Sequence, residues 1–99
     1  MAVIYKIPTI SDNYQYDLAA FLNYHGKFGR EIIQIYNEYG IFRDGYALAL
    51  EYDVVDTPDY FSDAETLFSS KGQNGWQFVT LFNSSAVFKK FSSYLALTP

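Results

Sequence analysis

Apolar residues recur at two different spacings along this chain, and the change between the spacings predicts the order of helices and strands. A short β-branched and aromatic run at residues 3–7 ends at Pro8 and predicts a first strand. Helix-capping residues at 11–13 then precede a segment whose apolar residues share one helical face: Tyr14, Leu18, Phe21 and Leu22. Strand patterns follow at 30–36 and 46–55, and turn-forming residues at 37–45 separate them.

The second half of the chain repeats this order. Thr57 and Pro58 suit the start of a helix, and a capping box at 62–65 offers a rival start one turn later. The helical apolar spacing continues to Phe68 and ends at Gly72. Strand patterns follow at 76–82 and 86–91, on either side of the turn at 83–85. The predicted element order is therefore β-α-β-β-α-β-β.

The two halves also match residue by residue at a constant offset of 46. The matched pairs include Asp17 with Asp63, Gly26 with Gly72, Gly29 with Gly75, and Asn37 with Asn83. Internal similarity at a fixed period indicates a repeated structural unit. We expect one α+β domain over residues 1–99, with pseudo-repeats at about 3–45 and 49–91 that arose by internal duplication. The expected arrangement is ferredoxin-like, with two helices on one face of a single antiparallel sheet and the last strand at an edge.

Each half carries a Gly-x-x-Gly turn directly after its helix. No helix follows these turns, so they have no helix N-terminus to present to a phosphate. We expect Gly26 and Gly72 to end their helices with a positive φ, because glycine adopts the left-handed conformation without a Cβ clash. Asp17 and Asp63 lie early in the two helices, where a carboxylate favours the helix dipole.

The two equivalent strands are apolar on both faces. Strict alternation places Ile33, Ile35, Val79 and Leu81 on one face. It places the candidate interaction face on the other: Ile32, Tyr36, Trp76, Phe78 and Phe82. A sheet with open water on one side should alternate apolar with polar residues. We therefore expect this second face to be covered by the loop at 37–45, by the C-terminal tail, by a second copy of the chain, or by a different partner.

Composition narrows the function classes. The chain has ten Tyr, nine Phe and one Trp, and a small domain has limited room for so many buried rings. It has no Cys, which excludes disulfides, thiolate metal sites and cysteine nucleophiles. The sequence has neither a membrane-length apolar run nor a signal-peptide layout, so we expect no membrane partner and a cytoplasmic location, in the host cytoplasm if the protein is viral.

The formal net charge is −4, and the segment between Arg43 and Lys71 carries acids without a base. Such a run is ordinarily a solvated surface, but it is also a candidate acidic patch for a basic partner. The candidate patch comprises Glu51, Asp53, Asp56, Asp59, Asp63 and Glu65.

Candidate chemistry is sparse. His25 is the only histidine, and the sequence contains no nucleophile elbow, zinc-protease motif, P-loop or dinucleotide-binding pattern. We expect no catalytic residues, no metal and no cofactor. The run at 75–79 resembles the base-stacking strand of an RNA-recognition motif, but Asn74 replaces its basic residue and the chain is acidic. Nucleic-acid binding is therefore not expected.

Residues 52–91 resemble a small bacterial and phage domain family of unknown function. The resemblance rests on the Gly-Gln-Asn-Gly-Trp-Gln-Phe-Val run at 72–79, on the returning strand that ends Phe88-Lys89-Lys90, and on an opening strand at 52–55. It implies a compact β-α-β-β unit and brings no activity with it. The leading hypothesis is a small non-enzymatic binding protein that forms a homodimer through its aromatic sheet face or binds another protein. The alternatives are an acidic, phage-type inhibitor or nucleic-acid-mimicking decoy of a basic protein, and a binder of a small ligand.

Overall fold

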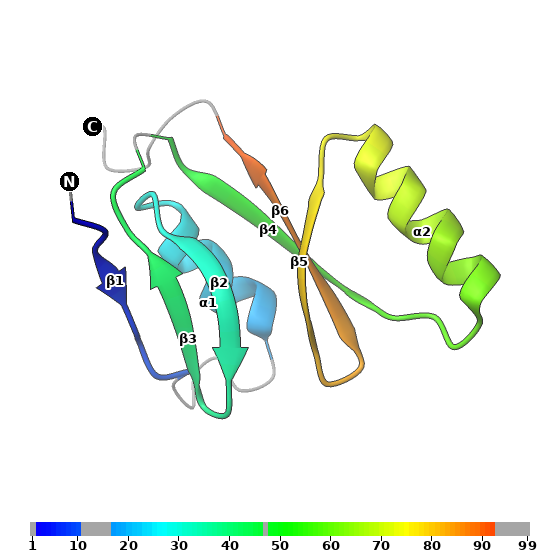
Figure 1. The fold of residues 1–99 in the computed structure, drawn as a ribbon, viewed down its shortest axis with the longest axis horizontal. Helices are drawn as coiled ribbons and strands as arrows, with labels where there is room; N and C mark the ends of the chain where they lie inside the picture. Colours follow the sequence, from blue (N-terminus) through cyan, green and yellow to red (C-terminus); the bar gives the residue numbers. More distant parts are fainter. Residues whose placement is uncertain (1, 11–16, 47, 93–99) are drawn as a thin grey trace.

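The strands of this chain form two separate sheets. The computed structural model describes residues 2–10, 17–46 and 48–92, so the predicted cap at 11–13 and the end of the tail lie outside the described residues. The fold is α+β, as predicted, and Figure 1 shows its elements, which are β1 (Tyr5–Lys6), α1 (Leu18–Gly26), β2 (Glu31–Tyr36), β3 (Tyr39–Arg43), β4 (Leu50–Asp56), α2 (Phe61–Gln73), β5 (Gln77–Phe82) and β6 (Ser85–Phe91).

Each sheet has three antiparallel strands, in the orders β1-β3-β2 and β4-β6-β5. The single ferredoxin-like sheet is therefore wrong for the described residues. Segment 37–45 is not only a turn, because it contains β3, and this strand completes a sheet within the first half of the chain. We call β1, α1, β2 and β3 the first half, and β4, α2, β5 and β6 the second half.

The two halves share backbone features at the predicted offset. A bulge interrupts the pairing between Ile32 and Gln34, and another interrupts it between Phe78 and Thr80. Asn37 and Asn83 begin the two hairpin turns with φ of 53° and 54°. Asn tolerates this left-handed conformation better than most residues, which explains its place in both turns.

The predicted roles of the glycines are wrong in detail. Gly26 and Gly72 lie inside the last turns of α1 and α2, and the positive φ values of 79° and 86° belong to Gly29 and Gly75. α1 ends at Gly26 and α2 ends one residue after Gly72, so each first glycine keeps a helical conformation and the chain reverses only at the second one. The left-handed residue of each Gly-x-x-Gly turn is therefore its last.

The main core lies where the two halves meet. α1 packs on β2 of its own half and on β4 of the second half (Figure 1). Asp17 caps this helix by accepting a hydrogen bond from the amide of Ala20 at 3.0 Å. The buried core residues come from both halves: Phe21, Leu22, Ile32, Ile35, Phe42, Leu50, Tyr52 and Val87. The second half therefore completes the core of the first.

The second helix is much less buried. None of the 13 residues of α2 is buried, whereas α1 buries Phe21, Leu22, His25 and Gly26. α2 packs on its own sheet through Phe68, whose ring centroid lies 5.0 Å from that of Phe78 and 5.1 Å from that of Phe88. Figure 1 shows α2 and β1 at opposite ends of the longest axis of the molecule.

Candidate interaction surface

The bulges change which residues share a sheet face. Ile32 pairs with Phe42, Gln34 with Ile41 and Ile35 with Gly40, so Ile33 is the extra residue. An extra residue reverses the alternation of side chains, and Ile32 and Ile35 therefore face the same side. By the same register, Phe78 and Leu81 share a face in β5.

The five residues predicted as one interaction face do not lie together. Ile32 is only 1% exposed and lies in the core, and Phe78 faces α2 through its contact with Phe68. Strict alternation gave a different result because it takes no account of a bulge. Tyr36 is exposed, and Phe82 is half-buried against the core. Trp76 is half-buried, with the ammonium group of Lys90 4.5 Å from its ring centroid.

The sheet face next to α2 is apolar and open. Phe78 and Leu81 are 46% and 53% exposed. The matching residues of the first half, Ile32 and Ile35, are 1% and 5% exposed. The same register position is therefore covered in one half and open in the other.

A second open apolar surface lies on β1 and on the residues directly before and after it. Val3, Tyr5 and Ile7 are each more than half exposed. β1 pairs with β3 on one side only and forms an edge of its sheet. The sequence predicted the strand but not this exposed surface. A match of residues 3–7 to the apolar residues of β4 would have indicated that the strand suits a covered position. The open residues in and beside β1 and the open residues of β5 form two separate candidate interaction surfaces.

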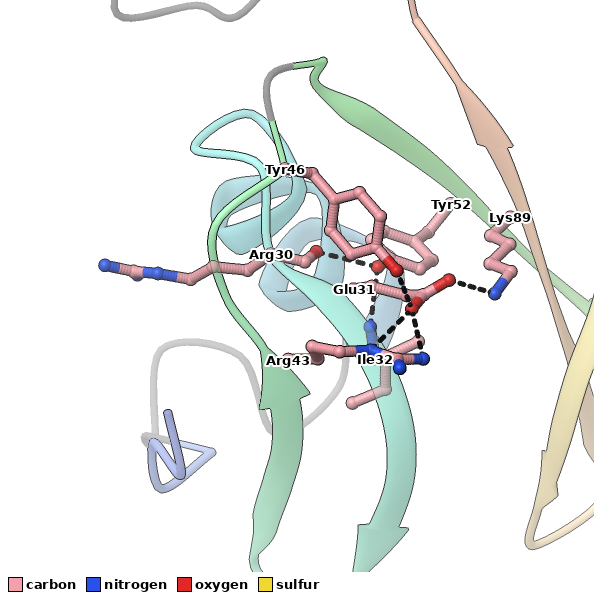
Figure 2. A network of polar contacts seen from close by, with 7 residues as sticks. All are labelled: Arg30, Glu31, Ile32, Arg43, Tyr46, Tyr52 and Lys89. Carbon is pink, nitrogen blue, oxygen red and sulfur yellow. Dashed lines mark hydrogen bonds and ion pairs between the residues drawn. The ribbon is translucent and has the colours of Figure 1, made fainter. Parts of the chain in front are cut away.

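Polar contacts at the junction of the halves centre on the carboxylate of Glu31 (Figure 2). Glu31 is 4% exposed. Its Oε1 accepts hydrogen bonds from Arg43 Nη2 and from the Tyr46 hydroxyl, each at 2.8 Å. Its Oε2 forms an ion pair with Lys89 of β6. The buried charge therefore has partners from both halves, as a buried carboxylate requires.

The environment of Glu31 shifts its own pKa and that of Tyr46. Burial acts to raise the pKa of Glu31, but hydrogen bonds from Lys89, Tyr46 and Arg43 and the charge of Lys89 outweigh it, so the pKa lies below its usual value. The hydrogen bond to Glu31 and burial raise the pKa of Tyr46. Glu31 is therefore ionised at neutral pH.

Tyr52 of β4 bonds directly to the backbone of the first half (Figure 2). Its hydroxyl accepts a hydrogen bond from the amide of Ile32 at 2.7 Å and donates one to the carbonyl of Arg30 at 2.8 Å. Its backbone amide and carbonyl pair with the side-chain amide of Asn23 in α1, at 2.8 and 3.0 Å. Burial raises the pKa of Tyr52, which keeps the hydroxyl protonated.

His25 occupies a structural position. Its ring lies 5.0 Å from that of Phe21 and 4.8 Å from that of Phe42, centroid to centroid. Its Nδ1 lies 2.9 Å from Nη1 of Arg30. Burial and the positive charge of Arg30 lower the pKa of His25 to about 4. Since the guanidinium can only donate, it occupies the Nδ1 lone pair of the neutral imidazole, which is then a poor base at that atom.

Part of the predicted acidic patch is neutralised. Asp53 forms an ion pair with Lys71, and Glu51 lies opposite Lys90 in the pairing of β4 with β6. The other four acids of the patch are exposed: Asp56, Asp59, Asp63 and Glu65. Among the described residues, no group of three or more His, Asp or Glu side chains could hold a metal ion.

A shallow hollow of about 330 Å³ lies beside the N-terminus of α1. Its lining is mixed, with carboxylates, an amide and apolar groups: Asp17, Leu18, Ala19, Val54, Asp56, Phe82, Asn83 and Ser85. A second hollow, of about 310 Å³, is lined only by residues of α2. Each hollow is lined by at least one hydroxyl and one carboxylate, and neither lining includes a histidine.

Comparisons of the chain with protein-family models, with curated proteins and with solved structures found no match. In the parts of the chain that the structure describes, neither helix has the length and apolar character needed to cross a bilayer.

Proposed function

We propose that this is a small non-enzymatic interaction protein whose partner is a second copy of the same chain. One observation carries the proposal. Phe78 and Leu81 are about half exposed, although the residues at the same register in the first half are buried. A further subunit that packs on this open face would cover both side chains.

The energetic argument is one of area. Burying an apolar side chain stabilises by about 25 cal/mol per Å², so the open halves of Phe78 and Leu81 are worth roughly 1–2 kcal/mol each. The exposed residues of β1 add a similar amount per side chain. Contiguous exposed apolar surface of this kind usually marks an interaction site.

An internal duplication of a β-α-β-β unit accounts for the shared bulges and turns at an offset of 46 residues. It agrees with the resemblance of residues 52–91 to a phage-type domain of the same element order. In this account, each unit needs a neighbouring unit to cover its helix. The first half has such a neighbour within the chain.

The acidic decoy is the less favoured function. Ion pairing of Asp53 with Lys71 and the position of Glu51 opposite Lys90 reduce the negative field that a basic partner would meet. An apolar interface and an acidic one also respond differently to salt, because screening weakens contacts between exposed charges.

Light scattering after size exclusion tests the proposal. At tens of micromolar, we expect a mass of at least twice the 11.4 kDa of one chain. We expect it to change little between roughly 0.05 and 0.5 M NaCl. A monomer at both salt concentrations would contradict self-association, and an oligomer that dissociates at high salt would favour a charged interface instead.

A further inference from the structure

We propose that β1 of one copy lies against α2 and β5 of another copy, in the way that β4 lies against α1 and β2 within one chain. This inference rests on the proposed self-association, and it names the two surfaces that meet. The arrangement is head-to-tail, because the two surfaces are different.

The contact between α1 and β4 is the pattern for this interface. Leu50 and Tyr52 of β4 are 2% and 4% exposed, and Val54 packs against the same core. Gly26 allows the close approach. A Cβ at Gly26 would collide with the carbonyl oxygen of Leu50 and would lie 2.8 Å from the ring of Tyr52.

The register shows which residues of β1 correspond to those of β4. Tyr5 pairs with Arg43 in the first sheet, and Tyr52 pairs with Lys89 in the second. Arg43 and Lys89 are matched at the offset of 46, so Tyr5 occupies the position of Tyr52. Counting along the strands matches the residues on either side as well: Val3 with Leu50, and Ile7 with Val54.

Tyr5 of β1 and its neighbours Val3 and Ile7 have the right chemistry for this position but are uncovered. Val3, Tyr5 and Ile7 are 53%, 56% and 58% exposed. They are two β-branched residues and a tyrosine at alternate positions, which suits an apolar strand face, although Ile4 on the opposite face is also 58% exposed. Their counterparts in β4 are covered by α1.

Gly72 supplies the complementary observation on α2. It matches Gly26, yet a Cβ at Gly72 would meet nothing within 4 Å. A glycine inside a helix costs stability relative to alanine, and no contact with the described residues requires this one. The docking of a strand against α2 accounts for it.

The matched positions also place the hydroxyl of Tyr5. Tyr52 bonds to the amide of Ile32 and to the carbonyl of Arg30. At the offset of 46, the corresponding groups of the second half are the amide of Phe78 and the carbonyl of Trp76. The ring of Tyr5 from a second copy would then lie beside Phe78 and cover it.

A single chain cannot make this contact, because β1 and α2 lie at opposite ends of the molecule (Figure 1). Each chain therefore offers one strand and accepts one strand. Head-to-tail contacts of this kind either close into a ring or continue as a filament. Two copies that exchange strands reciprocally form the smallest closed assembly.

Complementation between two broken variants tests the head-to-tail contact. Tyr5→Asp damages the donated strand, and Phe78→Asp damages the accepting surface. Each would bury an unpaired charge, so we expect each variant alone to associate at least about tenfold more weakly than the wild type. An equal mixture retains one intact junction, formed by β1 of the Phe78→Asp chain and α2 of the Tyr5→Asp chain. We therefore expect the mixture to form a 1:1 heterodimer.

Two further variants separate docking from general effects. Gly72→Ala places a methyl group where the strand docks, so we expect weaker association together with an unchanged or higher melting temperature of the dilute monomer. Phe61→Asp is the matched control, because Phe61 is 83% exposed at the other end of α2. We expect this variant to associate like the wild type.

Circular dichroism of each dilute variant checks that the monomer keeps its fold. If the wild type is a monomer, the proposed function itself fails. If the wild type associates but Tyr5→Asp, Phe78→Asp and Gly72→Ala associate equally well, self-association stands and the β1–α2 contact is wrong. If the two aspartate variants are monomeric but their mixture forms no heterodimer, the head-to-tail arrangement is overturned in favour of a face-to-face one.

Discussion

The two halves of this chain have the same order of elements and the same bulges, yet only the first has a complete core. α1 buries four residues, and none of the residues of α2 is buried. Two apolar residues are kept in both helices, because Phe21 and Leu22 match Leu67 and Phe68, but α2 is more polar around them: Glu65, Thr66 and Lys71 replace Ala19, Ala20 and His25. The halves also differ in the neighbour of the helix, since β4 covers α1 and no strand of the described residues covers α2 in this way. In such a fold, the burial of a helix depends on the next unit.

The largest expected effect comes from truncating matched core positions. Ile32→Ala removes a buried side chain and leaves a cavity, so we expect it to lower the free energy of unfolding by about 2–5 kcal/mol. Phe78→Ala should cost about 1–2 kcal/mol in the dilute monomer, because that side chain is half exposed. Urea unfolding at submicromolar concentration measures both. Equal costs would mean that the two positions are equally buried.

The next comparison concerns the charge at the junction. Glu31→Gln keeps the size of the side chain but leaves Lys89 without its counter-charge, so we expect a loss of about 3 kcal/mol. The matched residue is already a glutamine, Gln77, and it is exposed. Gln77→Glu should therefore change the free energy of unfolding by less than about 0.5 kcal/mol. Urea unfolding at pH 7 measures the free energy of unfolding of both variants. A negligible change for Glu31→Gln would show that the Glu31 network contributes nothing to stability.

The two helix glycines should respond to alanine with opposite signs. Gly26→Ala forces a methyl group against Leu50 and Tyr52, and overpacking of this kind costs about 1–3 kcal/mol. Gly72→Ala meets open space in the monomer and should stabilise it by up to about 1 kcal/mol through helix propensity. Thermal unfolding of dilute protein measures both. Destabilisation by both variants would contradict the open surface on α2.

A last difference, absent at neutral pH, is a pH dependence of stability that belongs to the first half. The pKa of His25 falls from 6.5 to about 4 on folding. Between these two values, the unfolded chain binds a proton that the folded chain does not, so stability should fall as the pH drops from about 6.5 to 4. The depressed pKa of Glu31 adds a loss at still lower pH. His25→Gln should reduce the fall in stability between pH 6.5 and about 4. An NMR titration of His25 with a midpoint near 6.5 would contradict this account.

The sequence predicted the order of elements but not how the sheets form. Helical and strand spacing located both helices, and the offset of 46 located the matched turns. β3 was missed because Asn37, Gly40 and Asp44 suggested a continuous turn. The division into two sheets was missed because the pattern of a strand does not name the strand that it pairs with.

The candidate site was harder to predict than the fold. A bulge adds one residue, and counting alternate positions cannot detect it, so Ile32 and Phe78 were placed on the wrong face. Which glycine has a positive φ depends on the last turn of the helix, and apolar spacing does not define that turn. The open surface became visible only when matched residues were compared for burial.

Hydrogen exchange at two protein concentrations tests the central claim most directly, because it measures the two helices in one sample. The claim is that α2 needs a second copy where α1 uses β4. Amide protection follows local opening, and a helix covered only in the assembly should exchange faster on dilution. We expect the protection of α2 and β1 to rise between submicromolar and high micromolar protein, while that of α1 stays constant. Protection of α2 that does not change with concentration would contradict the account.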